Sequence, residues 1–142
     1  MPIPLSTRGA PAQAINFDAW YTDGLLQIRK ITEEHVLHTY SAIEIYLILN
    51  SLQQQFGQDP FPLANNVERL GHGDEQPGLG MTILQVGFDR RTAHAQGSSY
   101  LGPCLEHLGY CEWNGEHHKI QWHLTRETIS DRQLLKDLSE QF

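Results

Sequence analysis

The chain has 142 residues, of which 39% are hydrophobic and 19% are charged, and its formal net charge at pH 7 is −7. This length predicts a single domain with one sizeable core. The negative charge opposes non-specific attraction to nucleic acid, and no apolar run approaches the length needed to cross a bilayer. Cys104 and Cys111 are the only cysteines and no secretory signal is apparent at the N-terminus, so we expect a cytoplasmic protein with reduced thiols.

Residues 1–20 are predicted to be a flexible arm, because the first 14 contain three prolines and no hydrophobic periodicity. Residues 25–31 alternate weakly, which indicates a strand or a first helical turn. A helix is expected from about Thr32, continuing into the segment after Ser41. There Ser41 and Glu44 have the spacing of a capping box, and a strongly apolar helix follows and ends at Gly57. So apolar a helix must be buried, as the first helix of a core or as a dimer contact.

The region 58–80 is rich in proline and glycine and reads as a connection, with a short helix at 63–70. Its glycine-rich part, residues 71–80, lacks the Lys-Ser/Thr ending of a phosphate-binding P-loop. Residues 81–88 are apolar enough to form a buried second helix or a strand. A run from Asp89 to Ala95 leads into the next helix.

A helix is predicted from Ser98 to Leu108. Ser98 and Ser99 are both residues that can cap its first turn, and Pro103 is expected in that turn as well. The apolar side chains follow an i, i+4, i+7 stripe, which consists of Leu101, Leu105 and Leu108. Gly109 is expected to end the helix, because glycine adopts the left-handed conformation without steric cost.

A β-hairpin is predicted directly after this helix. Asn114-Gly115 stands between two β-prone segments, 110–113 and 118–124, and is typical of a two-residue hairpin turn. Alternation in the second segment places Ile120, Trp122 and Leu124 on one face. The order helix, then hairpin, is that of the second half of a winged helix-turn-helix.

This segment resembles the PadR-like winged-helix transcriptional regulators. The likeness consists of Tyr100 followed by a Pro-x-Leu-x-x-Leu run from Pro103 to Leu108, and of an aromatic-x-Leu-Thr ending at Thr125. Leu101 and Gly102 intervene between the tyrosine and the proline, where the family usually has no residues. The resemblance covers about the last third of the chain.

The resemblance implies an α+β winged helix-turn-helix, with a three-helix core and a hairpin wing over residues 21–128. It also implies a C-terminal dimerisation helix within 129–142, which would present an apolar stripe of Leu134, Leu135, Leu138 and Phe142. The expected function is that of a homodimeric, sequence-specific DNA-binding regulator, a repressor, with no enzymatic activity. Its partners would be double-stranded DNA and a second copy, with no membrane, no cofactor and no structural metal. Any small-molecule effector stays unidentified.

The predicted DNA contacts fall into three groups. Tyr100 and the two serines on the helix would lie in the major groove. Basic residues before the helix would contact phosphates. Basic residues of the wing would contact phosphates of the neighbouring backbone. The complete set is Arg90, Arg91, Ser98, Ser99, Tyr100, His107, His117, His118, Lys119 and Arg126.

The acidic balance favours a different hypothesis, that of a winged-helix adaptor that binds protein and not DNA. Glu106 lies on the predicted recognition helix, and Glu112 and Glu116 flank the wing turn. The discriminating feature is the surface of the helix 98–108. A DNA reader should present its serines and Tyr100 outward, beside Arg90 and Arg91.

A small zinc protein is a further alternative, because Cys104, His107 and Cys111 have ligand-like spacing, with a wing histidine as the fourth ligand. Against it, Cys104 adjoins the leucine stripe, where a free cysteine behaves as a small hydrophobe, and no paired CxxC pattern is present.

An acid–base cluster of His35, His38 and Glu34 is the weakest alternative, because no nucleophile motif accompanies it.

Overall fold

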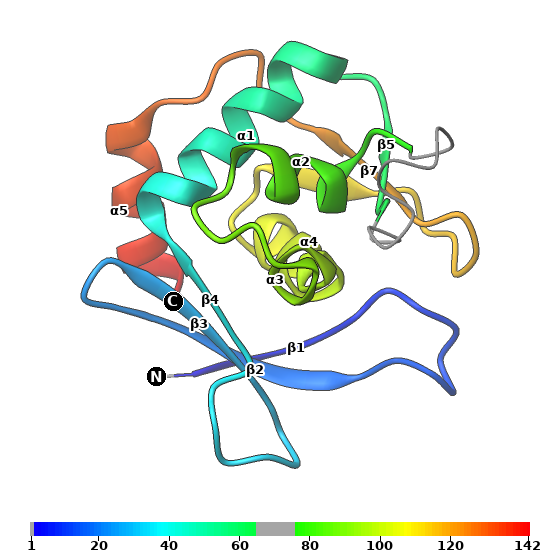
Figure 1. Ribbon diagram of the computed structural model, residues 1–142, viewed down its shortest axis with the longest axis vertical. Coiled ribbons are helices and arrows are strands. Elements are labelled where there is room, and N and C mark those ends of the chain that lie inside the picture. Colours follow the sequence, from blue (N-terminus) through cyan, green and yellow to red (C-terminus); the bar gives the residue numbers. More distant parts are fainter. Residues whose placement is uncertain (1, 65–75) are drawn as a thin grey trace.

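The computed structural model describes residues 2–64 and 76–142, and its described part is an α+β fold with an antiparallel four-stranded sheet and five helices (Figure 1). Residues 65–70 of the helix predicted over 63–70, and residues 71–75 of the glycine-rich loop, lie outside the described residues. The elements in chain order are β1 (Ile3–Ser6), β2 (Asn16–Thr22), β3 (Leu25–Lys30), β4 (His38–Ser41), α1 (Ala42–Phe56), β5 (Phe61–Pro62), α2 (Leu79–Val86), α3 (Thr92–Gln96), α4 (Ser98–His107), β6 (Cys111–Trp113), β7 (Gln121–Leu124) and α5 (Asp131–Gln141).

The N-terminal sheet has the order β1-β2-β3-β4, so that each strand pairs with its chain neighbour. The turn between β2 and β3 is formed by Asp23 and Gly24, whose φ angles are 52° and 78°. Positive φ at both central residues is the backbone geometry of a tight hairpin turn, for which Asp-Gly is a preferred sequence. Alternate residues of β2 and β3 are buried, among them Phe17 and Leu26, so one face of the sheet belongs to the core.

The flexible arm predicted for residues 1–20 is therefore wrong. β1 and most of β2 lie within it, and they pair over Ile3↔Ala19 to Ser6↔Asn16. A boundary at residue 21 would also cut β2. The helix expected before Ser41 is likewise wrong, because His38–Ser41 form the strand β4, paired with β3.

The capped helix after Ser41 is confirmed as α1. The Glu44 backbone N–H donates to Ser41 Oγ at 3.1 Å, and Gly57 ends the helix with a φ of 59°. Its buried face includes Ile45, Ile48, Leu49 and Leu52, and it packs against both α2 and α5.

The second sheet has three short strands in the order β5-β7-β6. β6 and β7 form the predicted hairpin, with Trp113 opposite Trp122. Its turn is longer than the two residues predicted, since residues 114–120 connect the strands. Asn114 organises this loop with its side chain, because its amide accepts from Glu116 N–H at 3.0 Å and donates to Lys119 O at 3.1 Å.

The C-terminal helix is confirmed as α5. Ser130 caps it by accepting from the Gln133 backbone N–H at 3.2 Å. Leu134 and Leu138 are buried, and the helix contacts α1 and β2 of the same chain, while Leu135 stays exposed. None of the described helices has the length and apolarity that a bilayer-spanning helix requires.

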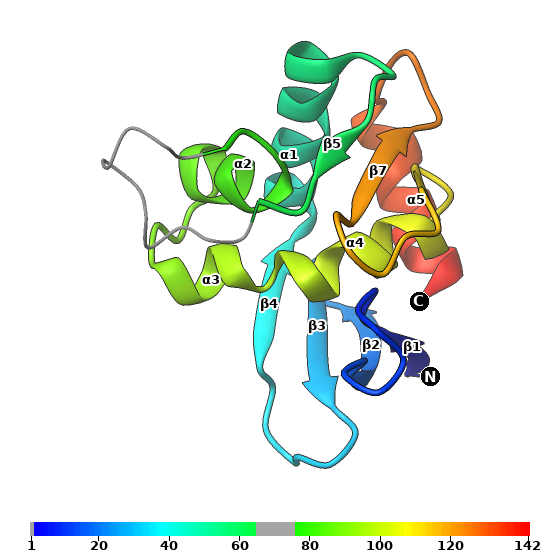
Figure 2. The same ribbon diagram turned by 90° about the vertical axis from the view of Figure 1, so that its right-hand side faces the viewer.

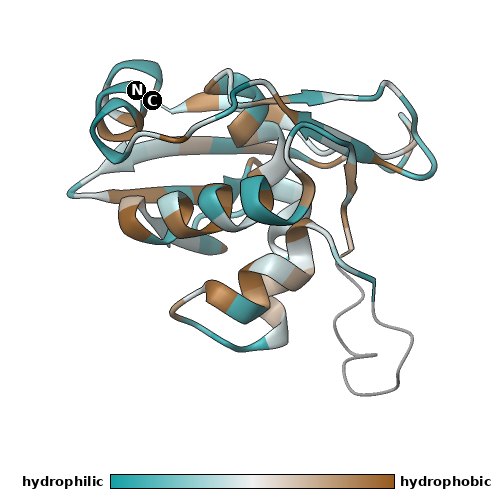
Figure 3. Cartoon of the chain, turned by 90° about the horizontal axis from the view of Figure 1, so that it is seen from above, coloured by the Kyte–Doolittle hydropathy of each residue, from teal (hydrophilic) through white to brown (hydrophobic). Residues whose placement is uncertain are grey.

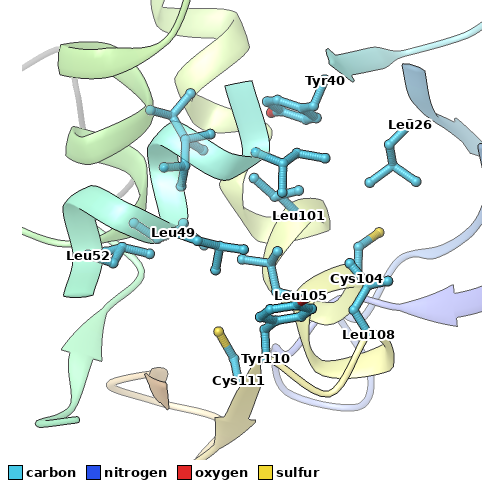
Figure 4. Close-up of a cluster of buried hydrophobic side chains, with 14 of the residues drawn as sticks. Leu26, Tyr40, Leu49, Leu52, Leu101, Cys104, Leu105, Leu108, Tyr110 and Cys111 are labelled. Atoms are coloured by element: carbon cyan, nitrogen blue, oxygen red, sulfur yellow. The ribbon is translucent and has the colours of Figure 1, made fainter. Parts of the chain in front are cut away.

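One hydrophobic core joins the N-terminal sheet to the helices. Figure 2 shows α4 crossing between the four-stranded sheet and the strands β5 and β7. Leu26 from β3, Leu49 from α1, and Leu101 and Leu105 from α4 converge in the cluster of Figure 4. Figure 3 shows polar and apolar residues alternating along the outer helices, as expected where a helix has one buried face. By contrast, α2 and α4 are buried over most of their length.

Candidate functional site

The predicted recognition helix exists as α4, but its start differs from the prediction. Gly97 is the N-cap and no side chain caps the first turn. Pro103 lies inside the helix, not in its first turn. Ser98 Oγ is buried and has no hydrogen-bond partner among the described residues, so Ser98 does not act as a cap.

Burial contradicts the predicted DNA-reading role of the helix surface. Ser98 is 0% exposed and Tyr100 is 7% exposed. The Tyr100 ring lies 5.2 Å from that of Phe17, edge to face, and 5.3 Å from that of His38, so strands β2 and β4 cover it. In this conformation Ser98 and Tyr100 cannot reach a DNA groove, and their assignment as DNA contacts is wrong.

The other predicted residues of α4 are partly engaged with the protein itself. Ser99 is half-buried, and its hydroxyl donates to Gln96 O at 3.4 Å. The His107 ring bonds to Gln141 O at 2.9 Å and packs on Phe142, so it ties α4 to the end of α5.

Glu106 anchors the N-terminal loop to α4 and to the β6–β7 hairpin. Arg8 donates to its two carboxylate oxygens at 3.1 and 2.5 Å, and Trp122 Nε1 donates to one of them at 2.6 Å. The Arg8 guanidinium also lies 4.5 Å from the centre of the Trp113 ring. These contacts join β1 and the loop after it to the face of α4 that a DNA-reading helix would leave free.

The predicted phosphate-contacting residues lie in separate places. Arg90 and Arg91 belong to the exposed connection between α2 and α3, and Figures 1 and 2 show this connection well away from the wing loop 114–120. Arg91 is already paired with Asp89, with Nη2 to Oδ2 at 2.6 Å. The structure does not gather these groups into one basic patch.

On the loop 114–120 of the β6–β7 hairpin, His118 and Lys119 are exposed, and the His117 ring bonds to Gly9 O at 2.8 Å. Arg126 follows the hairpin and lies 3.9 Å above the Tyr110 ring, with its Nη1 3.6 Å from Asp137. Arg126 thus has a structural role between the hairpin and α5.

A buried polar cluster, missed by the sequence analysis, consists of Tyr40, Glu44 and His94. The Tyr40 hydroxyl donates to His94 O at 2.7 Å, and the two rings lie 4.5 Å apart. His94 Nε2 contacts both oxygens of Glu44, the second at 3.1 Å. Burial, assisted by the negative charge of Glu44, raises the pKa of Tyr40 well above its usual value, so its hydroxyl stays protonated.

A hollow of about 570 Å³ adjoins this cluster. It lies between β4 and residues 88–94, and its lining includes Thr39 and Ser41 on one side and Phe88 and Arg91 on the other. Its volume is within the range of ligand sites in proteins. It is the best candidate for a binding site in the described part of the chain, because a concave surface, a buried polar cluster and an exposed aromatic side chain meet there.

The acid–base cluster of His35, His38 and Glu34 gains no support. His38 packs against the rings of Tyr40 and Tyr100, whereas His35 lies at the surface, 3.4 Å from Glu33. Burial, together with the nearby charges of His94 and Lys30, lowers the pKa of His38 to about 4.

The zinc alternative also gains no support. Cys104 and Cys111 are buried in the core, where burial raises the pKa of both thiols, and His107 bonds to α5 instead. Within 2–64 and 76–142, no three His, Cys, Asp or Glu side chains come together as metal ligands.

Known proteins add no assignment to this geometry. Comparisons with family models, with curated proteins and with solved structures found no match.

Proposed function

We propose that residues 42–124 form a winged helix, and that the chain is a protein-interaction domain that does not insert α4 into DNA. The order of elements supports the winged helix. α1, α2 and α4 supply three helices, the β6–β7 hairpin directly follows α4, and β5 adds a third strand to that wing.

The observation that carries the protein-binding proposal is the burial of α4 beneath the N-terminal sheet. A recognition helix must place several side chains against base edges in the major groove. Here the first turn of α4 faces Phe17 and His38, and Glu106 is bonded to Arg8 and Trp122. Exposing this face would require removing part of the common core.

Charge supports the same proposal. With a net charge of −7 the chain repels phosphate at long range, and its exposed cations are dispersed. Glu112 in β6 and Glu116 within the loop 114–120 are exposed, next to the basic side chains that would have to contact a DNA backbone.

A homodimeric DNA-binding regulator is the second candidate. It is favoured by Arg90, His118 and Lys119, which are exposed and have no ion pair within the described residues. In that case DNA would be held by phosphate contacts, with little direct reading of bases by α4.

Fluorescence anisotropy with labelled genomic duplex fragments, at about 50 mM and about 200 mM salt, separates the two candidates. The protein-binding proposal predicts no saturable, salt-sensitive binding. Affinity purification with the chain as bait, followed by titration of each recovered protein in purified form, should then yield a direct partner.

Salt-sensitive binding to DNA would overturn the protein-binding proposal if that binding depends on Arg90 and Arg91. The double variant Arg90→Ala/Arg91→Ala should then weaken binding by about 1 kcal/mol or more per lost contact on every fragment. Arg132→Ala, at an exposed position on α5, is the matched control and should change nothing.

A further inference from the structure

We infer that the free edge of β4 binds an extended peptide segment of a partner protein, which joins the four-stranded sheet as an additional strand beside the hollow. This inference rests on the proposed protein-binding function and names the surface and the kind of partner.

The edge of β4 carries backbone groups that face away from the sheet. β4 is the last strand of the order β1-β2-β3-β4. Ala42 N–H donates to Gly24 O at 3.0 Å, and antiparallel partners exchange hydrogen bonds at every second residue. The backbone of Tyr40 therefore faces β3, and that of the exposed residue Thr39 faces outward. Only another extended segment can pair such an edge along its length.

The hollow gives the added strand a place for its side chains. Residues 88–94 form the wall opposite β4, and Phe88 on this wall is 65% exposed. Phe88 thus supplies an apolar contact at the rim of a concave surface, and ligand sites combine concave shape with apolar side chains. A strand bound along β4 would direct every second side chain to one face of the sheet, where an apolar residue can cover Phe88.

The charge of Arg91 on this wall is balanced by Asp89, but its guanidinium keeps N–H donors that fit a carboxylate of the partner. Arg91 is held in place by Asp89, which accepts from Nε at 3.0 Å and from Nη2 at 2.6 Å. A guanidinium has five N–H groups in a fixed plane, so the remaining donors of Arg91 are oriented and open to solvent. They complement a carboxylate next to the apolar residue.

The short length of the edge favours a single peptide over a second copy of the chain. β4 has four residues, which span about 13 Å. Short edge strands resist pairing between two sheets, and the wall at residues 88–94 stands beside this edge. One extended segment fits between them more readily than the sheet of another molecule.

A random peptide library displayed on phage provides the probe. Peptides selected on the wild-type protein would be synthesised and titrated by isothermal calorimetry. We expect sequences with an apolar residue near an acidic one, and slowed hydrogen exchange at the Thr39 amide when the peptide is bound.

Thr39→Pro is the decisive variant, because it removes the outward N–H and leaves the hydrogen bonds to β3 intact. We expect about tenfold weaker binding of the selected peptide, which corresponds to the loss of one hydrogen bond. Thr39→Val keeps the N–H and is the matched control. Thermal melts of both variants verify folding. Phe88→Ala, in the connection between α2 and α3, tests the same site if Thr39→Pro does not fold.

The inference is wrong if no peptide is selected, or if the selected peptide binds folded Thr39→Pro and Phe88→Ala as tightly as the wild type. It is also wrong if Thr39→Pro converts a dimer to a monomer, since the occupant would then be a second copy. The proposed function fails on a different result, the cation-dependent binding of DNA.

Discussion

At the scale of single residues, Glu44 has two partners that stabilise the fold. Its backbone N–H is capped by Ser41, while its buried carboxylate contacts His94 of α3. Removing one member of a buried pair leaves the other uncompensated, which costs about 3–5 kcal/mol. We therefore expect Glu44→Ala to lower the free energy of unfolding by that amount in urea denaturation. Glu34→Ala, at an exposed position, should change it by less than about 0.5 kcal/mol, and equal effects would contradict this role.

Gly102 allows α4 to lie directly against strand β7. A Cβ built on Gly102 would overlap the indole ring of Trp122, which is itself held by Glu106. Gly102→Ala should destabilise the fold by about 1–3 kcal/mol, because an overpacked core must shift. Gly9→Ala is the matched control, since its Cβ would meet nothing within 4 Å. Identical melting temperatures for the two variants would show that the helix can move away from the wing.

Sequence patterns predicted the features that depend on near neighbours. Ser41 caps a helix three residues before Glu44, and Gly109 follows α4 with a φ of 84°, as expected of a helix stop. The contact between Glu44 and His94 joins positions 50 residues apart. No spacing rule connects such positions, so the polar cluster beside the hollow could not be predicted.

At the scale of elements, two similar turn sequences form connections of different length. Asp23-Gly24 forms the tight β2–β3 turn but was not identified, whereas Asn114-Gly115 opens a longer loop. The Asn114 side chain forms hydrogen bonds with backbone groups of that loop. These bonds take the place of the cross-strand backbone hydrogen bonds that a two-residue turn would allow. Recognition of Asp23-Gly24 as a hairpin signal would have argued against a flexible arm.

The contact between Tyr110, which precedes β6, and Asp137 of α5 predicts a pH dependence. Partial burial opposes ionisation of Asp137, but hydrogen bonds from Tyr110, at 2.8 Å, and Gln133 hold its pKa below the usual value. A lowered pKa in the folded state stabilises the protein above the pKa of the unfolded chain, and this stability is lost as the pH falls through the folded-state pKa.

Asp137→Asn should therefore lower the free energy of unfolding by about 1–2 kcal/mol at pH 7. The difference from the wild type should shrink as the pH is lowered below about 4. Urea denaturation across this pH range measures it, with Asp59→Asn, at an exposed position, as the control. A difference that is constant with pH would assign the effect to packing alone.

At the scale of the whole molecule, the N-terminal sheet and residues 42–124 share one core. Phe17 and Leu26 of the sheet are buried with Leu101 and Leu105 of α4. Local patterns predicted the helix and the hairpin separately, but they contain no information on which face of α4 the sheet covers. That long-range packing is why the predicted DNA surface is buried.

A shared core predicts a single unfolding transition. Trp20 reports on the sheet, and Trp113 and Trp122 report on the wing. With fluorotryptophan incorporated, the native ¹⁹F resonances of all three should disappear at the same urea midpoint. Loss of the Trp20 signal at a lower urea concentration would show that the sheet detaches first, which is the event that DNA reading by α4 requires.

The reactivity of the two buried thiols measures how often this opening occurs. Cys104 and Cys111 are buried, and their raised pKa values keep almost no thiolate present at neutral pH. An alkylating reagent can then modify them only in molecules that have opened, so the rate of modification counts openings of native molecules without denaturant. A bound partner that holds the sheet against the helices would lower the rate of alkylation. This effect would be measurable before the partner itself is identified.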